Sequence, residues 1–134
     1  MTWCTRLEEY DSLKRIIAGV KYARRFTGER IELPELINII ELARWAPSIG
    51  HIQPWEVIIM NEPREIKRLA RLHPAGYLFE QAGALIFIVL DPDQSPHYMI
   101  DGGSLTAYIA LAASIKGYAI IIVNLEDSHV YKTE

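Results

Sequence analysis

Residues 43–57 read ARWAPSIGHIQPWEV and separate a leucine- and isoleucine-rich helical pattern from a short apolar run. Two prolines, a glycine, a serine, a histidine, a glutamine and two tryptophans fall within this junction. A plain connection between a helix and a strand needs only a few turn residues. The junction is therefore predicted to hold something as well as to turn the chain.

Helical spacing marks the segments on both sides of the junction. The first helix is predicted from an apolar stripe, and the second begins near Pro34, a residue suited to the first turn. A third helix is predicted after Asn61, which can cap it, with Glu62 in its first turn. The apolar positions are Leu13, Ile16, Ile17 and Val20, then Leu36, Ile39, Ile40 and Ala43, then Ile66, Leu69 and Ala70.

Three apolar runs are predicted as strands, over residues 57–60, 84–90 and 118–123. The second run, ALIFIVL, has no polar member, which is typical of a strand that is covered on both faces. Asp101 can cap a fourth helix that runs to about Lys116 and stops at Gly117. This helix is apolar on all sides, so it is expected to be buried, and we favour a subunit interface over a single core.

The fold class is therefore α+β, a mixed sheet flanked by helices, in one domain over residues 1–134. The net charge of -3 gives no basic field for nucleic acid. The N-terminal residues MTWCTRLEEYDS lack a signal-peptide pattern, and the apolar runs are too short to cross a membrane. With a single cysteine, Cys4, a cytoplasmic protein is expected.

Most motifs for protein-borne chemistry are missing from the sequence. The four histidines and Cys4 have no metal-ligand spacing, and no nucleophile elbow or P-loop is present. Gly102 and Gly103 are expected to allow close backbone approach at a helix start. The aspartates and glutamates at element ends are expected to cap or to face solvent. No catalytic side chain and no metal ligand is identified, so any reaction is expected to depend on a bound cofactor.

Two stretches in this order resemble the nitroreductase-like flavoproteins. KYARRF (residues 21–26) is similar to that family's R-R-S-x-R-x-F motif, and APSIGHIQPW (residues 46–55) is similar to its A-P-S-x-x-N-x-Q-P-W motif. The ALIFIVLD strand and the helix ending in LAASIKGYA also resemble the next elements of the family. The resemblance covers nearly the whole chain, from about Ile16 to Val130.

The resemblance implies a homodimer with FMN at the subunit interface. It implies that NADH or NADPH reduces the flavin, which then reduces a nitroaromatic, a quinone or a related small molecule. Lys21 and Arg24 would face the FMN phosphate, because charge-assisted bonds to phosphate are strong. Ser48, His51 and Gln53 would serve the polar edge of the flavin, with Pro47 stiffening the backbone there. Phe26 and Trp55 are expected to pack rather than bind.

Val20 and Tyr22 stand where the family has an arginine and a serine, and His51 stands where it has an asparagine. Family members also usually continue beyond the last apolar segment, which here is followed by SHVYKTE (residues 128–134). An alternative function is therefore open, a shortened nitroreductase-fold protein with weak or no flavin binding that acts as a binding or interaction protein.

Overall fold

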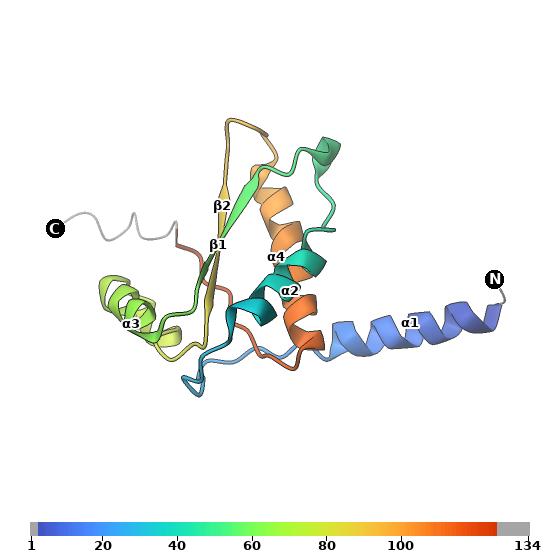
Figure 1. Cartoon of the computed structure of the whole chain (residues 1–134). Helices are drawn as coiled ribbons and strands as arrows, with labels where there is room; N and C mark the ends of the chain where they lie inside the picture. The colour runs from blue at the N-terminus through green and yellow to red at the C-terminus, as the bar shows by residue number, and fades with distance from the viewer. Residues whose placement is uncertain (1–2, 126–134) are drawn as a thin grey trace.

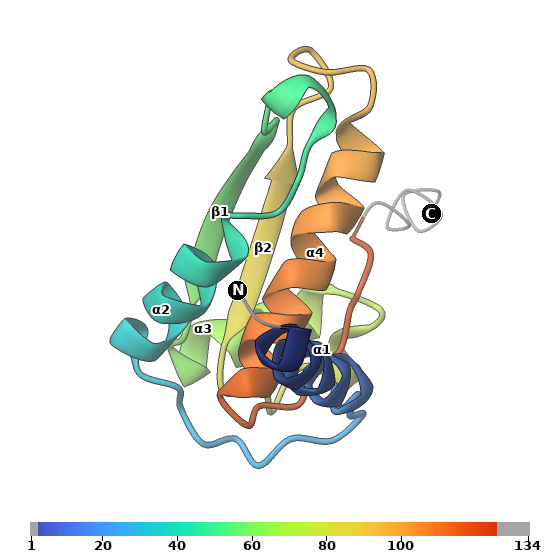
Figure 2. The ribbon, with the colours of Figure 1, turned by 90° about the vertical axis from the view of Figure 1, so that its right-hand side faces the viewer.

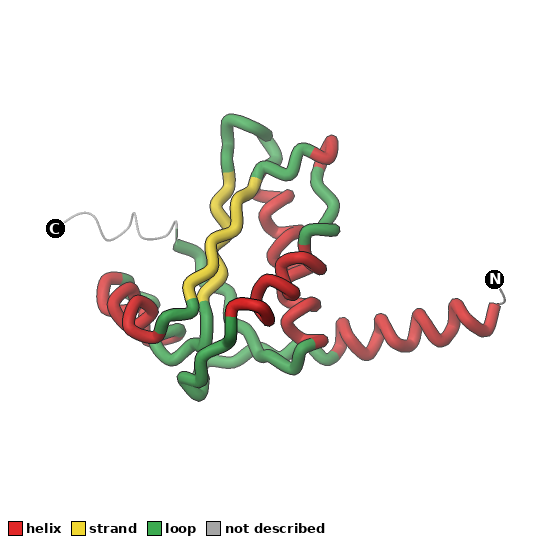
Figure 3. The backbone as a smooth tube through the Cα atoms, viewed as in Figure 1, coloured by secondary structure: helices red, strands yellow, loops and turns green. Residues whose placement is uncertain are grey.

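The structure is a computed structural model and describes residues 3–125. Figure 3 shows helices and loops around one pair of strands. In chain order the elements are α1 (Trp3–Ala18), α2 (Leu33–Ala43), the 3₁₀ turn η1 (Ile49–His51), β1 (Trp55–Met60), α3 (Pro63–Leu72), the 3₁₀ turn η2 (Gly76–Leu78), β2 (Leu85–Leu90) and α4 (Tyr98–Ile115).

The two strands form an antiparallel pair in which Trp55 lies opposite Leu90 and Met60 lies opposite Leu85. Alternate side chains of a strand point to opposite faces, so one face of the pair turns toward α2 and α4. The residues on that face that pack against the core are Trp55, Val57, Ile86 and Ile88. The predicted packing role of Trp55 is confirmed.

Helices cover both faces of the sheet, with α2 and α4 side by side on one face and α3 on the other (Figures 1 and 2). The core lies between α2, α4 and the sheet. Its buried members are Ile39, Ala43, Ala46, Leu105, Ile109, Ala112 and Ala113. Small residues on α4 allow this close packing, and each large aliphatic side chain buried there contributes about 1.5–3 kcal/mol. The α+β class is confirmed.

Gly102 explains how α4 approaches the sheet so closely. A Cβ atom at this position would lie 2.5 Å from Cδ1 of Leu90 on β2, so any side chain would force Leu90 to move. The expected close approach is therefore confirmed for Gly102. At Gly103 a Cβ atom would meet no described atom within 4 Å, and the expectation is wrong there.

Three expectations about element ends and strands need correction. Residues 118–123 are not a regular strand, and only Ile120 forms a parallel bridge, with Tyr22. Asn61 does not cap α3; Glu62 is the N-cap residue, and the Asn61 side chain donates a hydrogen bond to the Ile31 carbonyl. Asp101 does not cap α4, because that helix already begins at Tyr98. Gly117 ends α4 as predicted, with a φ of 85°.

The first helix projects away from the rest of the molecule (Figure 1). Its apolar stripe is helical as predicted, up to the end of α1 at Ala18. Leu13 and Ile17 are nevertheless more than half exposed. α4 likewise leaves Met99, Ile100 and Ile115 exposed. Within the described residues these apolar side chains have little to pack against. In the same part of the chain, no helix is long and apolar enough to span a membrane.

Candidate functional site

The junction between α2 and β1 has an unusual backbone conformation. Gly50, His51 and Gln53 have φ values of 63°, 57° and 53°, all in the left-handed region. Glycine adopts this region freely, whereas a residue with a Cβ atom pays about 1–3 kcal/mol unless its surroundings fix it. Two of the three left-handed positions, His51 and Gln53, carry side chains that the sequence predicts to bind a ligand. Strain of this kind is typical of functional loops.

Hydrogen bonds inside the junction hold this conformation. The Ser48 hydroxyl accepts a bond from the Gln53 N–H at 3.0 Å, and the Ser48 carbonyl accepts one from the His51 N–H at 3.0 Å. The Trp55 N–H donates to the Gln53 carbonyl at 2.8 Å, where the chain enters β1. Ser48 therefore bonds across the whole turn. Its own hydroxyl hydrogen is still available to an acceptor.

The start of α4 holds the junction from outside. A carboxylate oxygen of Asp101 (Oδ1) accepts a hydrogen bond from the Ile49 N–H at 2.8 Å. One turn further along the same helix, the Ser104 hydroxyl donates to the Pro47 carbonyl at 2.7 Å. Residues three positions apart lie on the same helix face, so one face of α4 contacts both sides of Ser48. The junction is thus fixed to the most buried helix of the molecule.

The junction presents four candidate side chains toward one end of the fold. Pro47 and His51 are exposed, and Ser48 and Gln53 are partly buried. Among residues 3–125, the side chains of His51 and Gln53 make no hydrogen bond of their own. Both remain able to donate to or accept from a bound molecule. The structure therefore brings together the four ligand-binding candidates of this motif.

The two cationic candidates lie elsewhere. Lys21 and Arg24 are exposed in the segment after α1, where neither has a carboxylate partner within the described residues. The segment is fixed by two backbone bonds to Ile120, one to the Lys21 carbonyl and one from the Ala23 N–H, both at 2.9 Å. Because Ile120 follows the last turn of α4, the basic segment lies near the C-terminal end of that helix.

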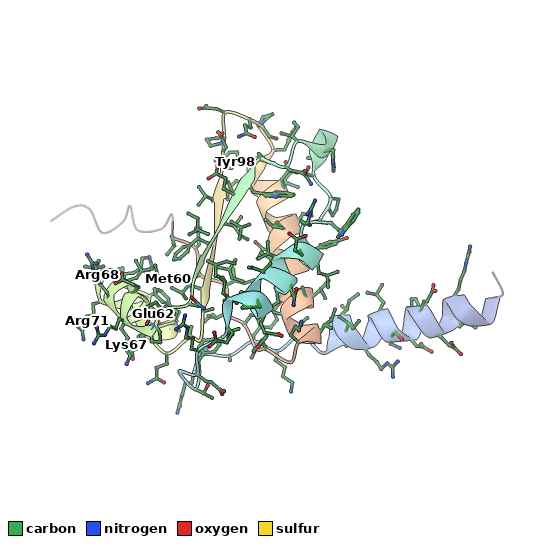
Figure 4. The ribbon with its side chains drawn as sticks, viewed as in Figure 1. Met60, Glu62, Lys67, Arg68, Arg71 and Tyr98 are labelled. Carbon is green, nitrogen blue, oxygen red and sulfur yellow. The ribbon has the colours of Figure 1, made fainter. Side chains whose placement is uncertain are left out.

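The candidates thus form two groups at opposite ends of α4. An 18-residue helix is about 27 Å long, at about 1.5 Å per residue. Figure 4 labels Tyr98, the first residue of α4, and Met60, the last residue of β1, toward opposite ends of the sheet. A single molecule therefore does not place Lys21 and Arg24 beside Ser48, His51 and Gln53.

The charged residues of α3 belong to neither group of candidates. Lys67, Arg68 and Arg71 project from α3 (Figure 4). His73 closes that helix, and its Nδ1 accepts a hydrogen bond from the Ala75 N–H at 3.1 Å. No group of three potential metal ligands comes together among residues 3–125. SHVYKTE, Glu126 and Asp127 lie outside the described residues.

Sequence reasoning missed the most buried polar residue next to the junction. Asp101 was expected to cap a helix or face solvent, but it is only 1% exposed. Its second carboxylate oxygen, Oδ2, has no hydrogen-bond partner within the described part of the chain. The helix pattern offered one available signal, because an aspartate inside an otherwise apolar helical run is expected to have a specific partner.

The chain is similar in sequence to proteins of known family. Residues 21–84, which include both groups of candidates, match the Nitroreductase family. A protein of Archaeoglobus fulgidus that is named as an NADH dehydrogenase/NAD(P)H nitroreductase is 28% identical over 104 residues. That match covers 72% of this chain but only 60% of the relative, so the chain spans about three-fifths of the relative's length.

Solved structures agree with the sequence match. A nitroreductase of Desulfitobacterium hafniense with bound FMN is 29% identical, with a TM-score of 0.67, covering 79% of this chain and 66% of its own. A nitroreductase family protein of Clostridium novyi is 21% identical, with a TM-score of 0.70, covering 90% of this chain and 75% of its own. The predicted resemblance is confirmed, and the chain is nitroreductase-like in fold.

Proposed function

We propose that this nitroreductase-like chain is an FMN-dependent oxidoreductase. In the proposed reaction a hydride passes from NADH or NADPH through the flavin to a nitroaromatic, a quinone or a similar small acceptor. The names of the relatives and the FMN bound to one of them support this reaction class. The chain's own residues support it through the two groups of candidates, which differ in chemistry as the two ends of FMN do.

The single observation that carries the proposal is the separation of these groups. Lys21 and Arg24 are exposed cations without carboxylate partners among residues 3–125, and they suit a dianionic phosphate. The junction offers uncharged polar groups on a stiff backbone, which suit the edge of a flat ring system. Because α4 holds the two groups apart, we infer that one FMN contacts the junction of one copy and the cations of another.

A second copy also accounts for the uncovered apolar surface. Leu13 and Ile17 on α1, with Ile100, Tyr108 and Ile115 on α4, are exposed. Burying apolar surface of this kind is the main driving force of association. We therefore propose a homodimer in which these two helices contribute to the contact. The flavin site would then lie at the subunit interface.

Within such a site the chain would bind and orient, and the cofactor would supply the hydride chemistry. Arg24 and Lys21 would hold the phosphate. The junction residues Ser48, His51 and Gln53 would hold the ring edge. The two hydrogen bonds that Ser48 accepts would keep the loop in place before the flavin arrives. Such preorganisation lowers the cost of binding. We further propose that residues 1–134 form one domain and that the protein is cytoplasmic.

One observation favours the non-catalytic alternative. Tyr22 is 69% exposed in the middle of the basic segment, where the related motif has a serine. Val20 also stands where the motif has its first arginine, so Lys21 and Arg24 are the motif cations that remain for a phosphate in that segment. A protein of this kind would keep the fold and bind another partner in place of the flavin. Flavin titration separates the two functions directly.

The test compares FMN with riboflavin, which has the same ring but no phosphate. Arg24→Ala is expected to weaken FMN about tenfold and to leave riboflavin nearly unchanged, because a hydrogen bond to a charged group contributes about 1.5–3 kcal/mol. Quenching of flavin fluorescence during titration measures both affinities. Arg25→Ala is the matched control, since it removes an adjacent exposed cation that falls outside the motif's fixed positions.

Equal losses for the two flavins in the Arg24 variant would refute the phosphate role. A colourless wild-type protein that takes up neither flavin would refute the oxidoreductase function altogether and favour the non-catalytic alternative.

A further inference from the structure

The packing around Asp101 does not explain why a carboxylate is buried there. The side chain is only 1% exposed, and Oδ2 has no partner among the described residues. A buried polar atom without a hydrogen bond destabilises a fold, so such groups in native proteins usually have a specific task. An apolar residue of similar volume would fill the same space without that penalty.

The hydrogen bond of Asp101 shows that it does not cap its own helix. Aspartate in the first turn of a helix often caps it or interacts with its dipole. Here the N-cap residue is His97, and the bond made by the Asp101 side chain goes to another segment, the Ile49 N–H at 2.8 Å. This bond joins residues 52 positions apart. Asp101 therefore acts on the junction more directly than on its own helix.

The Ile49 N–H lies at the point where the junction most needs support. Ile49 directly precedes Gly50, and the other two left-handed residues, His51 and Gln53, follow within the next three positions. A strained conformation persists only when surrounding groups over-determine it. Ser48 does so from within the loop, and Asp101 and Ser104 do so from α4. Of these two α4 residues, only Asp101 binds a backbone N–H of the turn itself.

We propose that Asp101 is a positioning residue for the flavin. It fixes residues 48–53 through the Ile49 amide, so that Ser48, His51 and Gln53 meet the polar edge of the flavin ring in a preformed arrangement. This inference rests on the proposed FMN function. Asp101 is expected to affect binding of the flavin ring and not of the phosphate. A comparison of FMN with riboflavin can therefore test the proposal.

The experiment titrates FMN and riboflavin into wild-type protein and into Asp101→Leu, which has a similar volume but no acceptor. We expect both flavins to weaken by the same factor, about tenfold or more, because they share the ring that the junction binds. Asp101→Asn keeps an oxygen that can accept the Ile49 N–H, and it is expected to restore part of the lost affinity. Asp93→Asn removes the same charge from an exposed position near the start of α4 and is expected to change neither affinity.

Hydrogen exchange of the Ile49 amide gives a readout that is independent of flavin. Exchange at Ile49 is expected to accelerate in the Asp101 variants, while the core amides of β1 and β2 stay protected. If Asp101→Leu does not fold, as judged by circular dichroism, Asp101→Asn carries the test through its Ile49 exchange and its equal effect on both flavins.

The outcomes separate the two proposals. If the wild-type protein binds both flavins and folded Asp101→Leu protein binds each of them as tightly as the wild type does, the positioning role is overturned and the proposed function stands. A variant that weakens FMN more than riboflavin also overturns it, because the effect would then lie at the phosphate. If the wild-type protein binds neither flavin, both proposals fall.

Discussion

Ser48 is the residue on which the conformation of the junction depends most directly. Its hydroxyl accepts the Gln53 N–H and its carbonyl accepts the His51 N–H, so one residue supports both strained side-chain positions. Both bonds span the left-handed Gly50. Removing the hydroxyl would leave the Gln53 N–H without its acceptor in a partly buried place.

Ser48→Ala is therefore expected to lower the free energy of unfolding by about 1 kcal/mol, the usual net contribution of one hydrogen bond. Urea denaturation followed by circular dichroism measures this change. Ser12→Ala is the matched control, because the Ser12 hydroxyl also accepts one hydrogen bond, from the Arg15 side chain, but lies on the projecting helix α1. Its effect is expected to stay within about 0.5 kcal/mol. Equal losses in the two variants would contradict the special role of Ser48.

The resemblance to the family motif predicts which residues of the junction form part of this candidate site. Pro47, Ser48, His51 and Gln53 were assigned from one motif, and the structure brings them together in one loop. The left-handed backbone at His51 and Gln53 was not predicted, since neither residue type requires it. The partner of Asp101 was also out of reach, because Ile49 lies 52 positions away and local patterns contain no information about such a bond.

Among the elements, α4 connects the other parts of the fold. It packs against α2 and β2, and it supports the junction at one end. Two adjacent glycines in its second turn face different surroundings. Gly102 lies against Leu90, whereas Gly103 faces open space among the described residues.

Alanine substitutions at these two glycines are predicted to have opposite effects. Gly103→Ala is expected to raise the free energy of unfolding by about 0.5–1 kcal/mol in the absence of flavin, because alanine favours the helix. Gly102→Ala is expected to lower it by about 1–3 kcal/mol, because the added methyl group overpacks the contact with Leu90. Thermal and urea unfolding measure both. Similar stability of the two variants would contradict the described packing of α4 on β2.

Elements with strong local patterns were predicted well, and those that depend on distant partners were not. β1 and β2 form where the apolar runs at 57–60 and 84–90 predict strands, and the structure shows that they pair. The run at 118–123 is equally apolar, yet it makes a single bridge to Tyr22, because a strand also needs a neighbour along its length. Asn61 was a plausible cap by residue type, but the Ile31 carbonyl takes its amide instead.

For the whole molecule, the separation of the two candidate groups is the main result. Lys21 and Arg24 are associated with the end of α4, and the junction is associated with its start. Exposed apolar residues on α1 and α4 are available for contact with another copy. Composition and motifs indicated the fold and the candidate binding residues. They contained no signal that one molecule holds these residues about a helix length apart.

A mixed dimer tests the shared site most directly. One copy would contain Lys21→Ala and Arg24→Ala, the other Ser48→Ala and Gln53→Ala, each with a different affinity tag for sequential purification of mixed pairs. FMN titration of the two separate variants and of the mixed pair measures affinity and stoichiometry.

If each FMN site uses the cations of one copy and the junction of the other, a mixed pair contains one intact site. We predict that the mixed pair binds about one FMN with wild-type affinity, whereas each variant alone binds weakly. A mixed pair that binds FMN no better than either variant would contradict a site shared between two copies.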